Sequence, residues 1–393
     1  MADQDHLATR CIHPKTEADA RGAPHTPVYN TTTFVFPDTA ALLDVQLGRK
    51  GGGFYTRYGM NPSILDLEAQ LAPLENAPRA LAFSAGMAAI SAACIAHGRR
   101  GVVCVGDVYG GTMELVGEQL PQLGIESRLL RDDEIPDLQS ILAEMKPSLL
   151  LLETPCNPTL AIRDIAAIAD LAHHYGALLA VDNTFATPVN QQPLALGADL
   201  VLHAATKYLG GHSDITAGVI MGSDALLKPI WNWRKNLGQI PAPETAALLS
   251  RSLRTLAVRV EQQNLSALRI AEAMSLHPKV NRVLYPGLPD FAGNSLARRQ
   301  MSGFGGMVTL DLAASAQETT AVVDHLRLFL NAPSLGGVES LVCQPFATTH
   351  FGLSVAERQR RGITDGMIRL SVGLEATEDL LADLQQALAI IES

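Results

Sequence analysis

Short apolar runs without alternating polar positions recur between residues 79 and 223. They lie at residues 80–83, 102–105, 149–152, 178–181, 200–202 and 218–221. Runs of this kind are typical of strands that are covered on both faces. Segments with helical spacing lie between them, for example the one with Ile165, Ile168, Ala169 and Ala172. The alternation predicts a mostly parallel sheet with helices on both sides.

The pattern changes at about residue 244. A long helical stretch over 244–276 leads to His277-Pro278, where we expect it to stop. Strands are predicted at 280–285, 306–312 and 367–372, and helices near 317–330 and 376–390. Strands and helices mixed around a smaller sheet predict an α+β domain.

Residues 1–50 show no regular pattern, because prolines interrupt any helix and residues 31–33 are all threonine. Their apolar and aromatic side chains indicate a docked segment, and an arm that reaches a neighbouring subunit satisfies this. We therefore predict three parts, namely the arm at 1–50, a large domain at 51–245 and a C-terminal α+β domain at 246–393.

Composition narrows the class of protein. The chain of 393 residues is 47% hydrophobic and 18% charged, which is ordinary for a globular enzyme. Its net charge of −10 disfavours a nucleic-acid partner, and Arg358, Arg360 and Arg361 form only a short local basic patch. The apolar runs are too short to span a membrane.

The cysteines and the first residues bear on the compartment. Five cysteines are scattered, with neither CxxC pairs nor metal-ligand spacing, so we expect a reducing cytoplasm and no metal. The first ten residues, MADQDHLATR, contain no hydrophobic stretch typical of a secretion signal, and none is expected.

The stretch 199–214, DLVLHAATKYLGGHSD, carries the first candidate chemistry. Lys207 follows a predicted buried strand, and Gly210 and Gly211 allow a sharp turn after it. Partial burial favours the neutral amine, which forms a Schiff base with pyridoxal phosphate (PLP). The alternative is a solvated lysine in a loop.

Other polar or small residues follow neighbouring strands, whose carboxyl ends meet at one crevice. These residues are Gly86 and Met87, Tyr109, Asn157, Asp182 and Thr206. Gly86 and Met87 open a helix, whose free N–H groups suit a phosphate. The set supplies the phosphate donors, the stacking ring and the acid that PLP needs, whereas each residue alone has a structural explanation in a turn or a cap.

Two further segments suggest anion binding. Tyr55 and Arg57 lie in the glycine-rich loop 51–63, which either holds an anion or is a flexible surface loop. Arg369 lies inside an apolar strand, where an unpaired charge is costly. Its partner is either a substrate carboxylate or a structural acid such as Glu375. Ser334 lies in a glycine-rich bend that is able to face the crevice.

With these residues in view, the chain resembles the Cys/Met-metabolism family of PLP enzymes, from about Thr9 to the C-terminus. The stretches that carry the resemblance are YTRYG, SAGMAA, DVYGGT, ETPCNPT, VDNTFATP, ATKYLGGHSD, SLGGVESL and IRLSVGLE. The resemblance implies PLP fold type I, as in aspartate aminotransferase, with a mostly parallel seven-stranded sheet. It also implies a homotetramer of two tight dimers that share active sites.

The resemblance assigns roles by position. Lys207 is similar to the imine-forming lysine and proton shuttle, Asp182 to the acid facing the pyridinium nitrogen, and Tyr109 to the stacked ring. The resemblance also implies phosphate contacts from Gly86, Met87 and Thr206 of the same chain, and from Tyr55 and Arg57 of the dimer neighbour. Asn157 is implied to contact the phenolic oxygen of the cofactor. The implied substrate contacts are Ser334, Arg369, Asn157 and Tyr55.

Departures from the family pattern bear on the reaction. Ala204 replaces a serine of many relatives, and the loop YTRYGMNPS is one residue longer than usual, both similar to β-lyases. Pro333 replaces a glutamate, as in plant-type γ-synthases, and Gly110-Gly111 after Tyr109 is the γ-type pattern. We expect γ-elimination or γ-replacement on cystathionine or an O-acylated homoserine. The alternative is cystathionine β-lyase, with methionine γ-lyase and O-acylhomoserine sulfhydrylase ranked behind it.

Overall fold

The computed structural model describes residues 5–13, 22–348 and 350–391. Residues 1–4 and 14–21 of the predicted arm lie outside the described residues. The larger of two sheets has the strand order β1-β7-β6-β5-β4-β2-β3. Its strands are β1 (Arg79–Phe83), β2 (Val102–Val105), β3 (Ser127–Leu130), β4 (Leu149–Glu153), β5 (Leu178–Asp182), β6 (Leu200–His203) and β7 (Gly218–Gly222).

Only β7 runs against the other strands of this sheet, since it pairs antiparallel with both β1 and β6. The remaining pairs are parallel. The mostly parallel seven-stranded sheet is therefore confirmed. Strand β3 was not predicted, because it lies at the sheet edge and its polar residues, including the exposed Arg128, break the apolar run.

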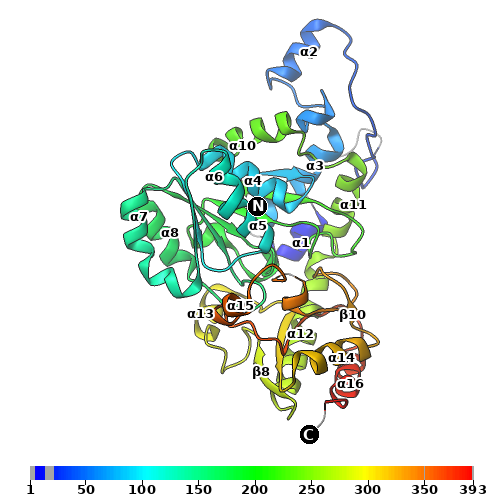
Figure 1. Ribbon diagram of the computed structural model, residues 1–393. Coiled ribbons are helices and arrows are strands. Elements are labelled where there is room, and N and C mark those ends of the chain that lie inside the picture. The colour runs from blue at the N-terminus through cyan, green and yellow to red at the C-terminus, as the bar shows by residue number, and fades with distance from the viewer. Residues whose placement is uncertain (1–4, 14–21, 349, 392–393) are drawn as a thin grey trace.

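Helices cover both faces of the sheet (Figure 1). α4 (Gly86–His97) and α10 (Asp224–Leu237) pack on one face, and α7 (Leu138–Met145) and α8 (Ile165–His174) on the other. Side chains alternate between the faces along a strand. In β4, Leu149 and Leu151 join the first core and Leu150 and Leu152 the second. This double burial explains why the run contains no polar position.

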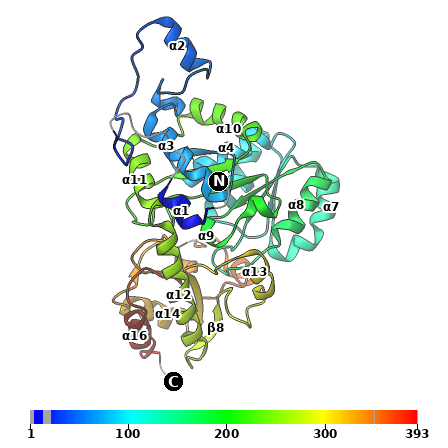
Figure 2. The same cartoon turned by 180° about the vertical axis from the view of Figure 1, so that it is seen from behind.

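The N-terminal region contains two helices that the sequence did not predict, α1 (Leu7–Ile12) and α2 (Thr39–Gln46). α1 packs into the core, whereas α2 projects away from the rest of the chain (Figures 1 and 2). The segment around α2 exposes apolar side chains, with Val35 97% and Leu47 59% exposed. Such exposure is typical of a surface that another chain covers.

The predicted helix over 244–276 is two helices, α11 (Pro243–Leu253) and α12 (Leu256–Ser275). The prediction of one continuous helix was wrong, because the chain turns at Arg254 and Thr255 instead of continuing the ladder. Asn61 caps α3 (Pro62–Leu71), since its side chain accepts from the Ser63 N–H at 2.9 Å.

The second sheet has the order β10-β11-β12-β9-β8. Its strands are β8 (Val280–Leu284), β9 (Met307–Leu312), β10 (Leu330–Asn331), β11 (Leu341–Cys343) and β12 (Met367–Ser371). α12, α14 (Ala316–His325) and α16 (Thr377–Leu388) form a core with it. The remaining α-helices are α5 (Gly110–Glu114), α6 (Leu120–Gln122), α9 (Thr187–Asn190), α13 (Asn294–Gln300) and α15 (Val355–Arg360). The predicted domain boundaries stay a prediction.

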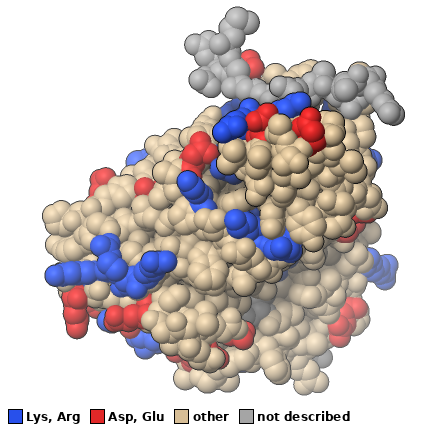
Figure 3. Space-filling model, turned by 90° about the horizontal axis from the view of Figure 1, so that it is seen from above, with Lys and Arg blue, Asp and Glu red and all other residues tan. Residues whose placement is uncertain are grey.

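The surface and the cysteines add little specific chemistry. The face seen from above mixes basic and acidic side chains over a largely uncharged surface (Figure 3). The five cysteines are buried, and none of them forms a disulfide. Within the described residues, no cluster of His, Cys, Asp and Glu is suited to a metal ion, and no helix is long and apolar enough to cross a membrane.

Asp383 stabilises the C-terminal core through backbone contacts. Its buried carboxylate accepts from the N–H groups of Arg327 (2.9 Å), Leu328 (2.8 Å) and Phe329 (3.2 Å). In Asp383→Asn an amide NH₂ replaces one acceptor, so the free energy of unfolding should fall by about 1–3 kcal/mol. Urea denaturation measures this change. An unchanged free energy of unfolding would show that these bonds do not stabilise the segment 327–329.

Candidate active site

A cavity of about 770 Å³ opens at the carboxyl ends of the central parallel strands. Such an edge is where ligands of parallel sheets bind. The structure brings nine of the eleven predicted site residues to it. They are Gly86, Met87, Tyr109, Asn157, Asp182, Thr206, Lys207, Ser334 and Arg369.

Lys207 lies in the turn that follows β6, and its amine lies inside the cavity rather than in a solvated loop. Nζ donates to Ser334 Oγ at 2.8 Å. Burial, helped by the nearby positive charge of Arg369, lowers the pKa of Lys207 to about 8. A much larger fraction of this amine is therefore neutral near pH 7 than for an exposed lysine.

Arg369 is a buried cation without a carboxylate partner in the described part of the chain. Nη1 donates to Asn157 Oδ1 at 2.7 Å, Nη2 donates to the Ser334 carbonyl at 2.9 Å, and Nε has no partner. Glu375 accepts instead from the Ser340 N–H and hydroxyl. The alternative of a salt bridge to Glu375 is thus wrong, and the guanidinium has spare capacity for an anion.

The start of α4 has the form of a phosphate cradle. The N-cap residue Ala85 makes no side-chain hydrogen bond to the helix, so the first-turn N–H groups receive no side-chain cap. A Cβ on Gly86 would lie only 2.8 Å from Ala204 Cβ, so the close approach of the two turns requires glycine. A serine hydroxyl at position 204 would add a donor that this chain lacks.

Thr206 contributes a hydroxyl to the same end of the cavity. Its Oγ1 donates to the Ala217 carbonyl at 3.2 Å and accepts from the Ala217 N–H at 3.0 Å. These two bonds fix the hydroxyl beside the cradle. A bound phosphate would compete with the Ala217 carbonyl for the hydrogen bond that the Thr206 hydroxyl donates.

Asp182 ends β5 and faces the cavity. Its Oδ1 accepts from the Thr184 N–H at 3.0 Å and from the Thr184 hydroxyl. Burial raises the pKa of Asp182, although the bonds from Thr184 and the nearby His203 oppose this. A cation such as a protonated pyridine nitrogen would offset the burial and keep the carboxylate ionised.

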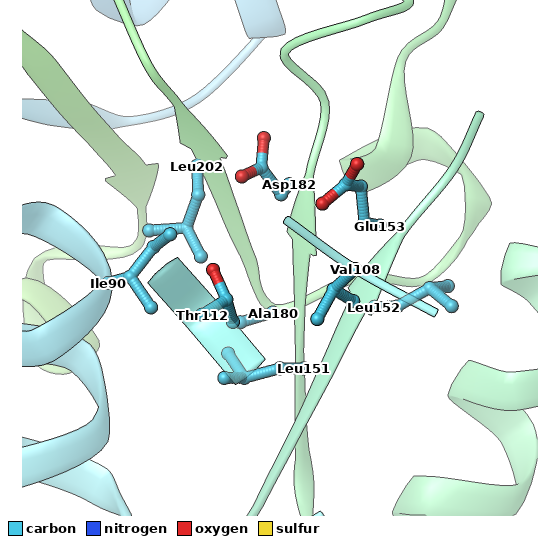
Figure 4. Close-up of a pocket in the computed structure, with 9 residues that line it drawn as sticks. All are labelled: Ile90, Val108, Thr112, Leu151, Leu152, Glu153, Ala180, Asp182 and Leu202. Carbon is cyan, nitrogen blue, oxygen red and sulfur yellow. The ribbon is translucent and has the colours of Figure 1, made fainter. Parts of the chain in front are cut away.

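Tyr109 stands at the mouth of the cavity, 49% exposed, at the N-terminus of α5. Its backbone N–H donates to Glu153 Oε2 at 2.7 Å. Glu153 also lines the cavity, and sequence reasoning missed it. It pairs in register with Asp182, and Figure 4 shows both carboxylates pointing the same way. A carboxylate as the last residue of an apolar strand was the available signal.

Tyr55 and Arg57 do not reach this cavity. Arg57 Nη1 donates to the Lys235 carbonyl at 2.6 Å, and its guanidinium lies 5.0 Å from the centre of the Tyr58 ring. Tyr55 packs edge-on against Tyr58 with ring centres 5.3 Å apart. Any action of these two residues on a cofactor therefore requires a second chain.

The comparison with known proteins agrees with this arrangement. A model of the family described as Cys/Met metabolism PLP-dependent enzyme matches residues 8–389. The chain belongs to this family. It is therefore a member of a family of PLP-dependent enzymes, and the donors, the acid and the lysine described above fit that cofactor.

Three similar proteins refine the placement. The cystathionine γ-synthase 1, chloroplastic, of Arabidopsis thaliana is 42% identical over 368 residues, 93% of this chain and 65% of that protein's length. An L-methionine γ-lyase of Pseudomonas putida is 41% identical over 389 residues, 97% of each chain. A crystal structure of cystathionine γ-synthase from Xanthomonas oryzae pv. oryzae with aminoacrylate and cysteine matches with a TM-score of 0.91, 38% identity and 98% of both chains. The predicted fold class is confirmed.

The lowered pKa of Lys207 predicts how cofactor uptake depends on pH. Only the neutral amine attacks an aldehyde, so the rate of PLP uptake by the cofactor-free protein should rise with pH and level off above about 8. Stopped-flow absorbance measures this rate. Free lysine, whose amine is exposed to solvent, serves as the control. An uptake rate that still rises above pH 10, as it does for free lysine, would mean that the Lys207 amine is exposed to solvent.

Proposed function

We propose that this chain is a PLP-dependent transsulfuration enzyme that catalyses γ-replacement or γ-elimination on cystathionine or an O-acylated homoserine. The observation that supports this most is the link through Ser334 between a lysine of lowered pKa and an arginine that has no carboxylate partner among the described residues. An α-amino acid offers an acidic Cα–H to the first and a carboxylate to the second.

The residues of the cavity would hold PLP by complementary groups. The start of α4 at Gly86 and Met87, together with Thr206, would bind the phosphate, and Asp182 would pair with the ring nitrogen. Tyr109 would cover the ring. When bound, PLP supplies an electron sink for the carbanion formed at the substrate Cα.

The protein's own groups then position the substrate and move its protons. Arg369 binds the α-carboxylate, and Ser334 accepts from Lys207 Nζ and so aims the amine. Lys207 Nζ takes the proton from Cα, and for γ-chemistry also moves a proton at Cβ. The Tyr109 hydroxyl is the acid available to the departing γ-substituent.

The lining of the cavity supports a γ-type reaction. A Cβ on Gly111 would lie 2.8 Å from the Tyr109 ring and 3.2 Å from Met87 Sδ. A larger residue at position 111 would therefore displace the Tyr109 ring, and glycine avoids this. Pro333 lines the cavity and offers no charge to the distal amine of a substrate. Ala204 and the longer loop are the features that favour β-lyase instead.

The assembly we propose is a homotetramer of two dimers, in which each chain lends Tyr55 and Arg57 to its neighbour's cavity. The exposed apolar segment around α2 and the distance of both residues from their own cavity support this. The reduced cysteines suit the cytoplasm as the compartment.

If Arg57 acts on the neighbour's cofactor, Arg57→Ala should weaken PLP affinity by about tenfold or more, because a charge-assisted bond is lost. Dialysis followed by titration with PLP measures the affinity. The matched control is Arg99→Ala, an exposed arginine in the turn between α4 and β2, outside both the arm and the loop. Equal affinity in the two variants would mean that the loop does not cross between chains.

L-Cystathionine supplied alone separates the possible reactions. We expect 2-oxobutanoate and cysteine, because γ-elimination breaks the bond from Cγ to sulfur, and chromatography of the keto acids identifies the product. With no keto acid, O-acyl-homoserine plus cysteine should yield cystathionine. Pyruvate with homocysteine would contradict the proposal and assign a β-lyase. Lys207→Ala is the control, and it should fold normally without turnover.

A further inference from the structure

Glu153 is a buried carboxylate in the lining of the main cavity, and the roles assigned above leave it unused. It is the last residue of β4 and is only 5% exposed. Together with Asp182 it lines both the main cavity and a second, smaller cavity of about 10 Å³, whose lining is drawn in Figure 4. A buried carboxylate is costly unless its oxygens are satisfied, so its contacts need explanation.

Each oxygen of Glu153 accepts from a different segment of the site. Oε2 accepts from the Tyr109 N–H at 2.7 Å, and Oε1 accepts from the Asn157 N–H at 3.2 Å. Tyr109 follows β2 and Asn157 follows β4, so one carboxylate ties two loops that meet at the cavity. The bonded groups are backbone, and the side chains of both residues line the cavity.

We propose that Glu153 is a positioning residue, whose two oxygens set where Tyr109 and Asn157 stand relative to Asp182. This inference rests on the proposed PLP site. Tyr109 would cover the cofactor ring, and Asn157 also accepts from the guanidinium of Arg369, so a shift of either would misplace cofactor and substrate together.

The electrostatics agree with a site role. Burial and the neighbouring Asp182 raise the pKa of Glu153 to about 8, while the two backbone bonds and Arg163 lower it. The strand register holds Glu153 next to Asp182, and like charges this close disfavour ionisation of both carboxyl groups.

Glu153→Gln tests the proposal, because it keeps the size of the side chain and replaces one acceptor by an NH₂ group. Asp383→Asn is the matched control, since it makes the same change in a buried carboxylate that also accepts backbone N–H bonds, but in the C-terminal core. PLP affinity, visible circular dichroism of the bound cofactor, kcat and KM for L-cystathionine, and urea unfolding are measured for each.

For Glu153→Gln we expect about tenfold weaker PLP binding from the lost bond, and weaker visible dichroism from a misplaced ring. We also expect kcat/KM to fall about 100-fold, mostly in kcat, because reacting groups are misaligned. Asp383→Asn should change only the unfolding. Glu153→Asp keeps both acceptors and should recover part of the dichroism.

The proposal is overturned if Glu153→Gln, like the control, changes only the unfolding. If Glu153→Gln fails to fold, Glu153→Asp tests the proposal instead. Wild-type dichroism and wild-type kcat in this variant, whose side chain is shorter, would also overturn the proposal. A wild-type protein that binds PLP but forms pyruvate would contradict the proposed reaction and leave this inference standing, because affinity and dichroism do not depend on the product.

Discussion

Two cations share one cavity, and the described part of the chain gives neither of them a carboxylate partner. Lys207 donates to Ser334, and Arg369 donates to Asn157 and to the Ser334 carbonyl. Neutral partners satisfy hydrogen-bonding groups but do not offset charge, so burial lowers the pKa of Lys207. The same arrangement leaves Arg369 able to bind an anion. A basic amine beside a carboxylate receptor is what chemistry at the α-carbon of an amino acid requires.

The sheet brings the acids of the site to the cavity that also holds these cations. Glu153 and Asp182 end adjacent parallel strands, so they stand side by side at one edge, and Lys207 follows the next strand. Arg369 comes from the second sheet. A ligand that carries both positive and negative groups therefore finds partners at this site. The cofactor of this family, together with an amino acid, has that distribution of charge.

The sequence was sufficient for the main sheet and for most of the cavity. Strands buried on both faces appear as apolar runs, and their ends carry the polar residues that meet at one edge. The edge strand β3 has no such run, so no pattern marked it. Glu153 was missed because it completes β4, where a polar residue was taken to mark only the end of the strand. Tyr55 and Arg57 do not reach the cavity of their own chain. Any contact of these two residues with a cofactor therefore depends on a second chain, which neither the sequence nor the structure of one chain contains.

If the cavity is a PLP site, Lys207 is the residue that holds the cofactor. Reduction of the PLP-loaded protein with borohydride fixes the cofactor covalently to the lysine that holds it, and mass spectrometry of the digested protein identifies that residue. We expect one phosphopyridoxyl group per chain, on Lys207. A modification on another lysine, such as the exposed Lys228, or no modification after loading, would contradict this expectation.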